Sequence, residues 1–137
     1  MASIRKERKE LHTRAPAEAV WAAAADVGAL HVRLAPGFVL DTKLEGDARI
    51  VTFANGTTVR EPIVSIDPEN KRLVWTLEGG RARHYNASFQ VFAEPLGARV
   101  VWICDFLPDE IAPFIAGAME AGLAAMQPTL DRLEAPS

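Results

Sequence analysis

The sequence predicts an α+β fold, in which an antiparallel sheet is followed by one long C-terminal helix. Two observations predict it. Six short strand-like segments follow one another at ordinary spacing, and the short turns between them require antiparallel neighbours. After them, residues 108–133 repeat large apolar residues at the helical period. We therefore expect one strand, two short helices, six strands and a long helix, in a single domain over residues 1–137.

The N-terminal part supplies the first strand and the two short helices. Residues 3–13 are expected to form an edge strand, although their apolar pattern is weak. A helix follows over 16–25, because Pro16 is tolerated in a first turn and the acidic Glu18 is favourable there. A second, shorter helix is expected to end before Pro36.

Six further strands are bounded by residues that favour chain reversal. They are expected at 38–45, 48–54, 57–66, 72–78, 83–93 and 98–107. The turn signal at Asn55-Gly56 is strong and predicts a two-residue hairpin loop. Pro128 lies inside the last helical pattern, where a proline should kink a helix or end its regular part.

Composition excludes several classes of protein. With 137 residues, of which 49% are hydrophobic and 24% charged, the chain matches a globular domain with a substantial core. A formal charge of −3 gives no general attraction to nucleic acid. No apolar run approaches the ~20 residues that span a bilayer, and the charged first residues do not resemble a signal peptide. We therefore expect a cytoplasmic protein with no nucleic-acid partner, while its oligomeric state stays open.

Few residues support a metal site, a cofactor or a nucleophile. His12, His31 and His84 are far apart in sequence and lack the close pairs typical of zinc sites. Cys104 is the only cysteine, and its place within a strand favours an inert core thiol. Phosphate-binding and dinucleotide-binding glycine motifs are missing from the sequence. We therefore expect neither a metal nor a cofactor.

The last two strands present one face richer in large apolar groups. A loop at residues 94–97 sets their register. It pairs Phe89 with Trp102, Ala87 with Cys104, Tyr85 with Phe106, and Val91 with Val100 on one face. This face is expected to meet the long helix, so that Asn86 and Asp105, which pair on the opposite face, point to solvent.

The strand at 57–66 turns either Arg60 or Glu61 towards the interior, because successive residues alternate between faces. A two-residue loop at Asn55-Gly56 places Glu61 opposite Ile50. A five-residue loop at 67–71 then turns Glu61 inward, which we expect, whereas a four-residue loop turns Arg60 inward.

Glu61 is therefore the ionisable residue of greatest interest. In apolar surroundings its pKa would rise, unless an arginine such as Arg49 or Arg33 reaches it. The alternative interpretation is a carboxylate at the rim, in a surface ion pair.

Several strings match a known superfamily. They are APAEAVW at 15–21, DV at 26–27, DP at 67–68 with RLVW at 72–75, and RVVW at 99–102 leading to DFLP at 105–108. With the order of elements, they resemble the START/Bet v 1-like (SRPBCC) superfamily, especially its bacterial polyketide cyclase/dehydrase-like branch. The resemblance implies a helix-grip fold, a seven-stranded curved sheet wrapped around the C-terminal helix.

The long helix has little side-chain volume on its apolar face, because alanines and glycines separate its large residues. We therefore expect an apolar ligand pocket between sheet and helix. Its expected wall is Phe38, Leu40, Thr52, Glu61, Trp75, Tyr85, Phe89, Trp102, Cys104, Phe114, Ala118, Met119 and Gly122. The resemblance places the second short helix at the mouth of this pocket, where His31 and Arg33 would meet a polar ligand group. Alternatively, both are exposed on a polar helix face.

Three functions follow from this interpretation. The first is binding of a hydrophobic or aromatic small molecule, lipid- or polyketide-like, oriented by Glu61 and Tyr85. The second, which the resemblance supplies, is a polyketide cyclase or dehydratase with Glu61 as acid/base and Tyr85 as donor. The third is a protein-interaction or stress module whose cavity is incidental.

Overall fold

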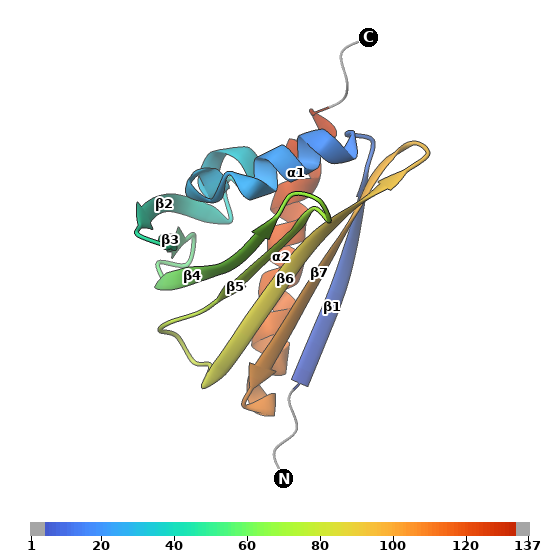
Figure 1. The fold of residues 1–137 in the computed structure, drawn as a ribbon. Coiled ribbons are helices and arrows are strands. Elements are labelled where there is room, and N and C mark those ends of the chain that lie inside the picture. The colour runs from blue at the N-terminus through green and yellow to red at the C-terminus, as the bar shows by residue number, and fades with distance from the viewer. Residues whose placement is uncertain (1–4, 134–137) are drawn as a thin grey trace.

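A seven-stranded antiparallel sheet curls around one long helix in the computed structural model, which describes residues 5–133 (Figure 1). The strands lie in the order β1-β7-β6-β5-β4-β3-β2. They are β1 (Arg5–Thr13), β2 (Val39–Glu45), β3 (Ala48–Phe53), β4 (Thr58–Asp67), β5 (Arg72–Thr76), β6 (His84–Glu94) and β7 (Gly97–Leu107). The predicted α+β helix-grip fold is confirmed, and β1 and β2 are the two edges of the sheet.

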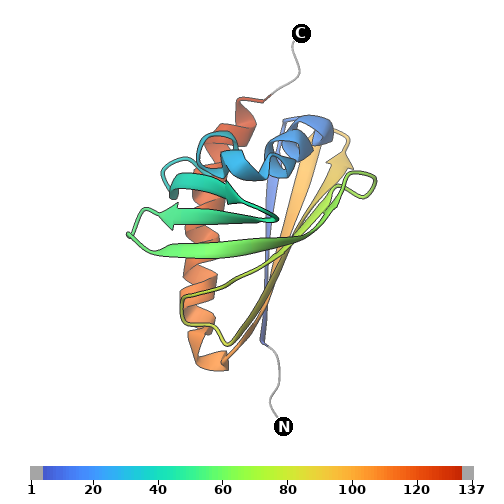
Figure 2. The same cartoon turned by 60° about the vertical axis from the view of Figure 1, so that its left-hand side comes forward.

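The long C-terminal helix runs along the inner side of the curved sheet, and the short helices that follow β1 lie at one end of it (Figure 2). The helices are α1 (Ala17–Ala25), the 3₁₀ turn η1 (Val27–Ala29), the π-helical turn η2 (Leu30–Leu34), the 3₁₀ turn η3 (Asp109–Ile111) and α2 (Ala112–Asp131). A salt bridge of 3.0 Å joins Lys9 of β1 to Glu120 of α2, and another of 2.9 Å joins Lys71 to Glu18 of α1. Helix α2 continues for three residues beyond Pro128, so the proline does not end it.

Helix α2 buries one face against the sheet. Its buried residues recur at intervals of three or four, as an amphipathic helix requires. They are Ala112, Ile115, Met119, Gly122, Met126 and Leu130. The predicted helix and its thin apolar face are therefore both present.

The space beside this thin face is nevertheless filled at Gly122, contrary to the expectation of a hollow. A β-carbon at Gly122 would lie 3.0 Å from the Trp102 ring and 3.3 Å from the Phe38 ring. Both rings therefore pack directly on the helix backbone, and the missing side-chain volume of α2 is supplied by aromatic side chains outside the helix.

The register of β6 and β7 is as predicted, with Phe89 opposite Trp102 and Tyr85 opposite Phe106. That of β3 and β4 differs by one residue, because the loop has three residues rather than two. The amide of Phe53 donates to the carbonyl of Thr57 at 2.8 Å, and the Thr57 amide donates to the Asn55 side chain at 2.9 Å. Gly56 adopts a φ of +88°, which favours glycine.

The consequence of this shift is that Glu61 lies opposite Arg49 and not opposite Ile50. A second irregularity keeps Glu61 on the inner side. The pair Asp67–Arg72 closes a four-residue loop, which alone would turn Arg60 inward, but a β-bulge at Val64 restores the alternation. Ile63 therefore lies opposite Trp75, as predicted. Arg60 lies outside, paired with Glu45 and Glu78.

Candidate functional site

A buried ion pair lies on the concave side of the sheet. Arg49 Nε donates to Glu61 Oε1 at 2.8 Å, and the two side chains are only 3% and 7% exposed. The guanidinium also donates from Nη1 to the carbonyl of Val27 at 3.4 Å, and it lies 5.2 Å from the centre of the Trp75 ring. Arg49 thus joins β3, β4, β5 and η1.

Burial makes the charged form of Glu61 less favourable than it is in water. Burial raises the pKa of this carboxyl above 4.5, and the charge and hydrogen bond of Arg49 oppose the rise without cancelling it. A buried carboxyl with a raised pKa next to a cation is typical of acid/base sites, and it also occurs in structural ion pairs.

Tyr85 and Cys104 form a second polar pair in the interior. The Tyr85 hydroxyl lies 3.2 Å from the Cys104 sulfur. Burial raises the pKa of Cys104 to about 12 and raises that of Tyr85 well above 10. Glu61 also raises the Tyr85 pKa through its charge, which places both groups in one electrostatic environment. Cys104 is therefore a neutral thiol, and Tyr85 offers a neutral hydroxyl.

Two tryptophans carry polar atoms that the described residues do not satisfy. Trp75 and Trp102 are 6% and 7% exposed, and their ring centroids lie 6.3 Å apart. Each indole Nε1 is buried without a hydrogen-bond acceptor in residues 5–133. The Trp102 N–H lies near the Cys104 thiol, and this contact lowers the pKa of Cys104, against the larger rise caused by burial. The contact does not have the geometry of a hydrogen bond.

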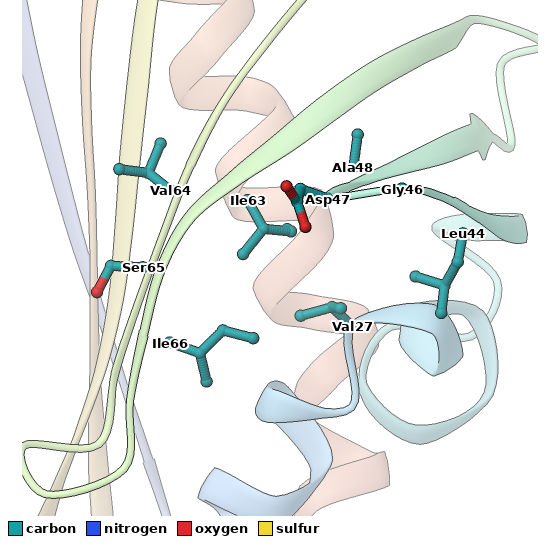
Figure 3. A pocket seen from close by; sticks show the side chains of 9 residues that line it. All are labelled: Val27, Leu44, Gly46, Asp47, Ala48, Ile63, Val64, Ser65 and Ile66. Carbon is teal, nitrogen blue, oxygen red and sulfur yellow. The ribbon is translucent and has the colours of Figure 1, made fainter.

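A pocket of about 410 Å³ opens on the concave side, between η1, the β2–β3 turn and β4 (Figure 3). Its lining residues are Val27, Leu44, Gly46, Asp47, Ala48, Ile63, Val64, Ser65 and Ile66. Leu44 lies opposite Arg49, and Ile66 lies opposite the buried Leu73, so both belong to the inner face. They are nevertheless 62% and 46% exposed, because this corner of the sheet is open.

The ion pair lies directly behind the wall of this pocket. Val27 contributes its side chain to the lining and its carbonyl to Arg49. Ile63 lines the pocket two residues after Glu61 on the same face of β4. The pocket wall therefore includes direct neighbours of Arg49 and Trp75.

A second pocket, of about 780 Å³, lies at the β6–β7 hairpin and the end of α2. Several of its polar groups are already paired with one another: His12 with Glu94 at 2.8 Å, and Thr13 with Asp131 at 2.7 Å. This pocket is larger, but most of the residues that line it are polar or charged, so the pocket beside Arg49 is the better candidate for an apolar ligand.

Sequence comparison decides the family. Residues 2–136 match the model of a family described as polyketide cyclase/dehydrase and lipid transport. The chain belongs to this family. Its membership confirms the resemblance to the START/Bet v 1-like superfamily. No curated protein matches the chain significantly in sequence.

Solved structures share the fold of this family member. An uncharacterised protein from Bacillus thuringiensis has a TM-score of 0.82 at 19% identity, over 92% of this chain and 98% of its own. XoxI from Bacillus cereus has a TM-score of 0.80 at 20% identity, over 99% and 100%. Norcoclaurine synthase from Thalictrum flavum, solved in complex with dopamine and hydroxybenzaldehyde, has a TM-score of 0.70 at 19% identity, over 96% and 86%. At these identities the likeness shows the fold alone.

Most residues of the predicted pocket wall lie in the interior of this polyketide cyclase-like protein. Glu61, Trp75, Phe89, Trp102, Cys104, Met119 and Gly122 are buried, while Phe38, Tyr85 and Ala118 are half-buried. The packing of Phe38 and Trp102 on Gly122 brings the sheet and helix members together.

Three predicted wall residues lie elsewhere. Leu40 is 57% exposed, because a bulge between Val39 and Asp41 interrupts the alternation of β2. Phe114 is 46% exposed in the first turn of α2, with the Arg81 guanidinium 5.1 Å from its ring centre. Thr52 follows the buried Val51 and so faces away from it, with its hydroxyl 3.2 Å from that of Thr58.

The two residues predicted at the pocket mouth, His31 and Arg33, lie in different surroundings. Arg33 is exposed and paired with Asp26 at 3.0 Å, which fits the alternative of a polar helix face. His31 is half-buried, and its Nδ1 has no hydrogen-bond partner in the described part of the chain. Neither residue lines the pocket of Figure 3.

Residues 5–133 contain neither a membrane-spanning helix nor a cluster of metal ligands. None of the helices there has the length and apolar character that crossing a bilayer requires. Nor does that part of the chain bring three or more His, Cys, Asp or Glu side chains close enough together to hold a metal ion.

Proposed function

We propose that this protein binds a hydrophobic or aromatic small molecule, lipid- or polyketide-like in character, on the concave side of its sheet. The observation that carries the proposal is the apolar pocket of about 410 Å³ beside the buried Arg49–Glu61 pair. Its size lies within the ~300–1,000 Å³ of typical small-molecule sites. Its wall combines apolar side chains with a few polar groups close behind, as such sites do.

Burial of apolar surface would drive binding. Leu44 and Ile66 lie on the inner face but remain exposed to solvent. A ligand that removes roughly 200 Å² of apolar surface from water would gain about 5 kcal/mol before association costs, at ~25 cal/mol per Å². The norcoclaurine synthase complex supports the idea that this fold can hold aromatic molecules.

The expected position of the ligand follows from the part of the interior that aromatic side chains already fill. Trp102 and Phe38 occupy the space beside Gly122. We therefore expect a ligand to bind at the open corner between η1 and β4, where the pocket lies. We place its apolar body against Leu44, Ile63 and Ile66, with any polar group directed towards Arg49 and Glu61.

A second candidate is a dehydratase or cyclase, and the raised pKa of Glu61 favours it. In a dehydration, the Glu61 carboxylate would take a proton from the carbon next to a carbonyl and return it to the departing hydroxyl, which leaves as water. Tyr85 would donate a hydrogen bond to the carbonyl. The family description includes cyclases and dehydrases, which is compatible with this role.

Two matched variants on β2 test the binding proposal. Leu44→Glu places a carboxylate in the pocket wall, whereas Leu40→Glu makes the same change on an equally exposed residue outside the pocket. With the neutral fluorescent probe N-phenyl-1-naphthylamine, we expect Leu44→Glu to weaken binding at least tenfold and Leu40→Glu to leave it unchanged. Equal effects of the two variants, or no binding by the unmodified protein, would contradict the proposal.

Glu61→Gln should retain the probe, and it would abolish turnover only if the protein is an enzyme.

A further inference from the structure

The two unpaired indole N–H groups indicate what the ligand must offer. Trp75 and Trp102 lie on the inner face of neighbouring parts of the sheet, with ring centroids 6.3 Å apart. Both Nε1 atoms are buried: Trp75 Nε1 meets no acceptor in residues 5–133, and Trp102 Nε1 has only the weakly accepting Cys104 sulfur beside it. A buried donor without an acceptor is costly, and most buried polar groups in proteins are paired. The interior therefore has an excess of neutral hydrogen-bond donors.

Trp75 is close to the pocket. It lies directly opposite Ile63, which lines the pocket, and residues paired in this way have β-carbons about 4.5–5.5 Å apart. The Arg49 guanidinium lies over the Trp75 ring and is bound to the Val27 carbonyl at the pocket wall. Trp75 therefore lies directly next to residues of the pocket wall.

The charge of this region determines which acceptor fits. The Arg49 guanidinium is already matched by Glu61 at 2.8 Å. A carboxylate on the ligand would add a buried negative charge with no cation of its own, which is strongly unfavourable. A neutral oxygen acceptor satisfies the indole groups without disturbing the ion pair.

We propose that the ligand is an apolar molecule with a neutral carbonyl group, such as a ketone or an ester, whose oxygen accepts from Trp75 Nε1 and, where the ligand extends far enough, from Trp102 Nε1. The inference rests on the proposed function, because it concerns the polar end of the same ligand. It excludes simple hydrocarbons and fatty acids as the preferred ligands of this site.

Three compounds of nearly equal shape test the inference: 2-acetylnaphthalene, 2-ethylnaphthalene and 2-naphthoic acid, titrated at pH 8. We expect the ketone to bind three- to tenfold more tightly than the hydrocarbon, as one neutral hydrogen bond provides, and the acid to bind most weakly. An ordered water can also accept a hydrogen bond from an indole N–H. If a water does so here, the hydrocarbon will bind as tightly as the ketone, and the inference is wrong. Tighter binding of the acid would overturn it as well.

Phenylalanine variants assign the donor. Trp75→Phe keeps a ring but removes the N–H, so the ketone should lose its three- to tenfold advantage over the hydrocarbon. Trp21→Phe on α1 is the control, because Trp21 is also 7% exposed and its nitrogen is not among the buried unpaired atoms. An advantage that persists in Trp75→Phe and in Trp102→Phe would contradict the assignment.

A measurement on the unmodified protein keeps the inference testable if these variants fail to fold. The carbonyl stretch of bound 2-acetylnaphthalene should shift to lower frequency than in hexane, as it does for a hydrogen-bonded ketone. An unshifted band would contradict the inference. If none of the three compounds binds, the proposed function itself fails, and this outcome differs from equal binding of ketone and hydrocarbon.

Discussion

Arg49 and Glu61 lie directly opposite each other on β3 and β4, and their side chains meet 2.8 Å apart in the interior. This pairing depends on a loop at the far end of the hairpin. If the loop at Asn55-Gly56 had two residues instead of three, Glu61 would lie opposite Ile50, with no cation across the strand. The length of a surface loop thus decides whether the buried carboxyl has a partner.

Removal of one partner of this pair should destabilise the fold more than removal of both. Glu61→Leu leaves the buried Arg49 guanidinium without its carboxylate partner, so we expect a loss of about 3–5 kcal/mol in the free energy of unfolding. The double variant Arg49→Met/Glu61→Leu should recover most of that loss. Urea denaturation of the unmodified protein, Glu61→Leu, Arg49→Met and the double variant measures this, and a double variant as unstable as the sum of the single ones would contradict it.

The raised pKa of Glu61 predicts a pH dependence with a definite sign. The folded protein holds the Glu61 proton to higher pH than the unfolded chain, whose value is near 4.5. The contribution of Glu61 to stability is therefore complete below pH 4.5 and decreases as the pH rises through the folded pKa. The unfolding free energy of the unmodified protein should fall relative to that of Glu61→Gln above pH 4.5. A difference that is constant between pH 4 and pH 8 would show that the pKa is not raised.

Two glycines of α2 should respond differently to alanine. A β-carbon added at Gly117 would point into open space, with no packed neighbour within 4 Å, whereas one at Gly122 would lie 3.0 Å from the Trp102 ring. Gly117→Ala should stabilise the protein by about 1 kcal/mol through helix propensity. Gly122→Ala has the same propensity gain but forces the ring to move, so it should be at least ~1 kcal/mol less stable than Gly117→Ala. Equal stabilities in thermal or urea denaturation would mean that Trp102 does not pack on the helix backbone.

Cys104 should be chemically inert in the folded protein. Its side chain is fully buried, and burial raises its pKa to about 12, so very little thiolate is present at pH 8. Reaction with a thiol-specific disulfide reagent should therefore be very slow in buffer and rapid in denaturant. Tyr85→Phe should leave the thiol just as slow, because burial is the larger cause. Rapid labelling of the native protein would instead show that the interior opens readily.

The features that the sequence predicts correctly depend on local patterns. Residues 108–133 repeat their large apolar groups at the helical period, and the helix forms at 112–131. The pairing of Phe89 with Trp102 follows from one short loop between two long strands. The sequence offers Arg49 and Arg33 as arginines that could reach Glu61; Arg49 reaches the carboxylate, and the pKa of Glu61 is raised nevertheless.

The errors arise where several elements act together. Asn55-Gly56 is compatible with two-residue and three-residue loops, and only the packing of the strands selects one. The hollow expected beside Gly122 is filled by Trp102 and Phe38, whose positions are not encoded in the helix pattern. The pocket at η1 and β4 is not predicted, although Ile63 and Ile66 give a signal: two apolar residues three apart face the same side of a strand only across a bulge.

Methyl NMR of the protein titrated with 2-acetylnaphthalene tests where a ligand binds. The proposed site predicts that the largest shifts occur at Val27, Leu44, Ile63 and Ile66, with Leu40 and Leu96 unchanged. Shifts centred on Leu96 at the second pocket, or no shifts at ligand concentrations well above millimolar, would contradict a ligand site beside Arg49 and Glu61.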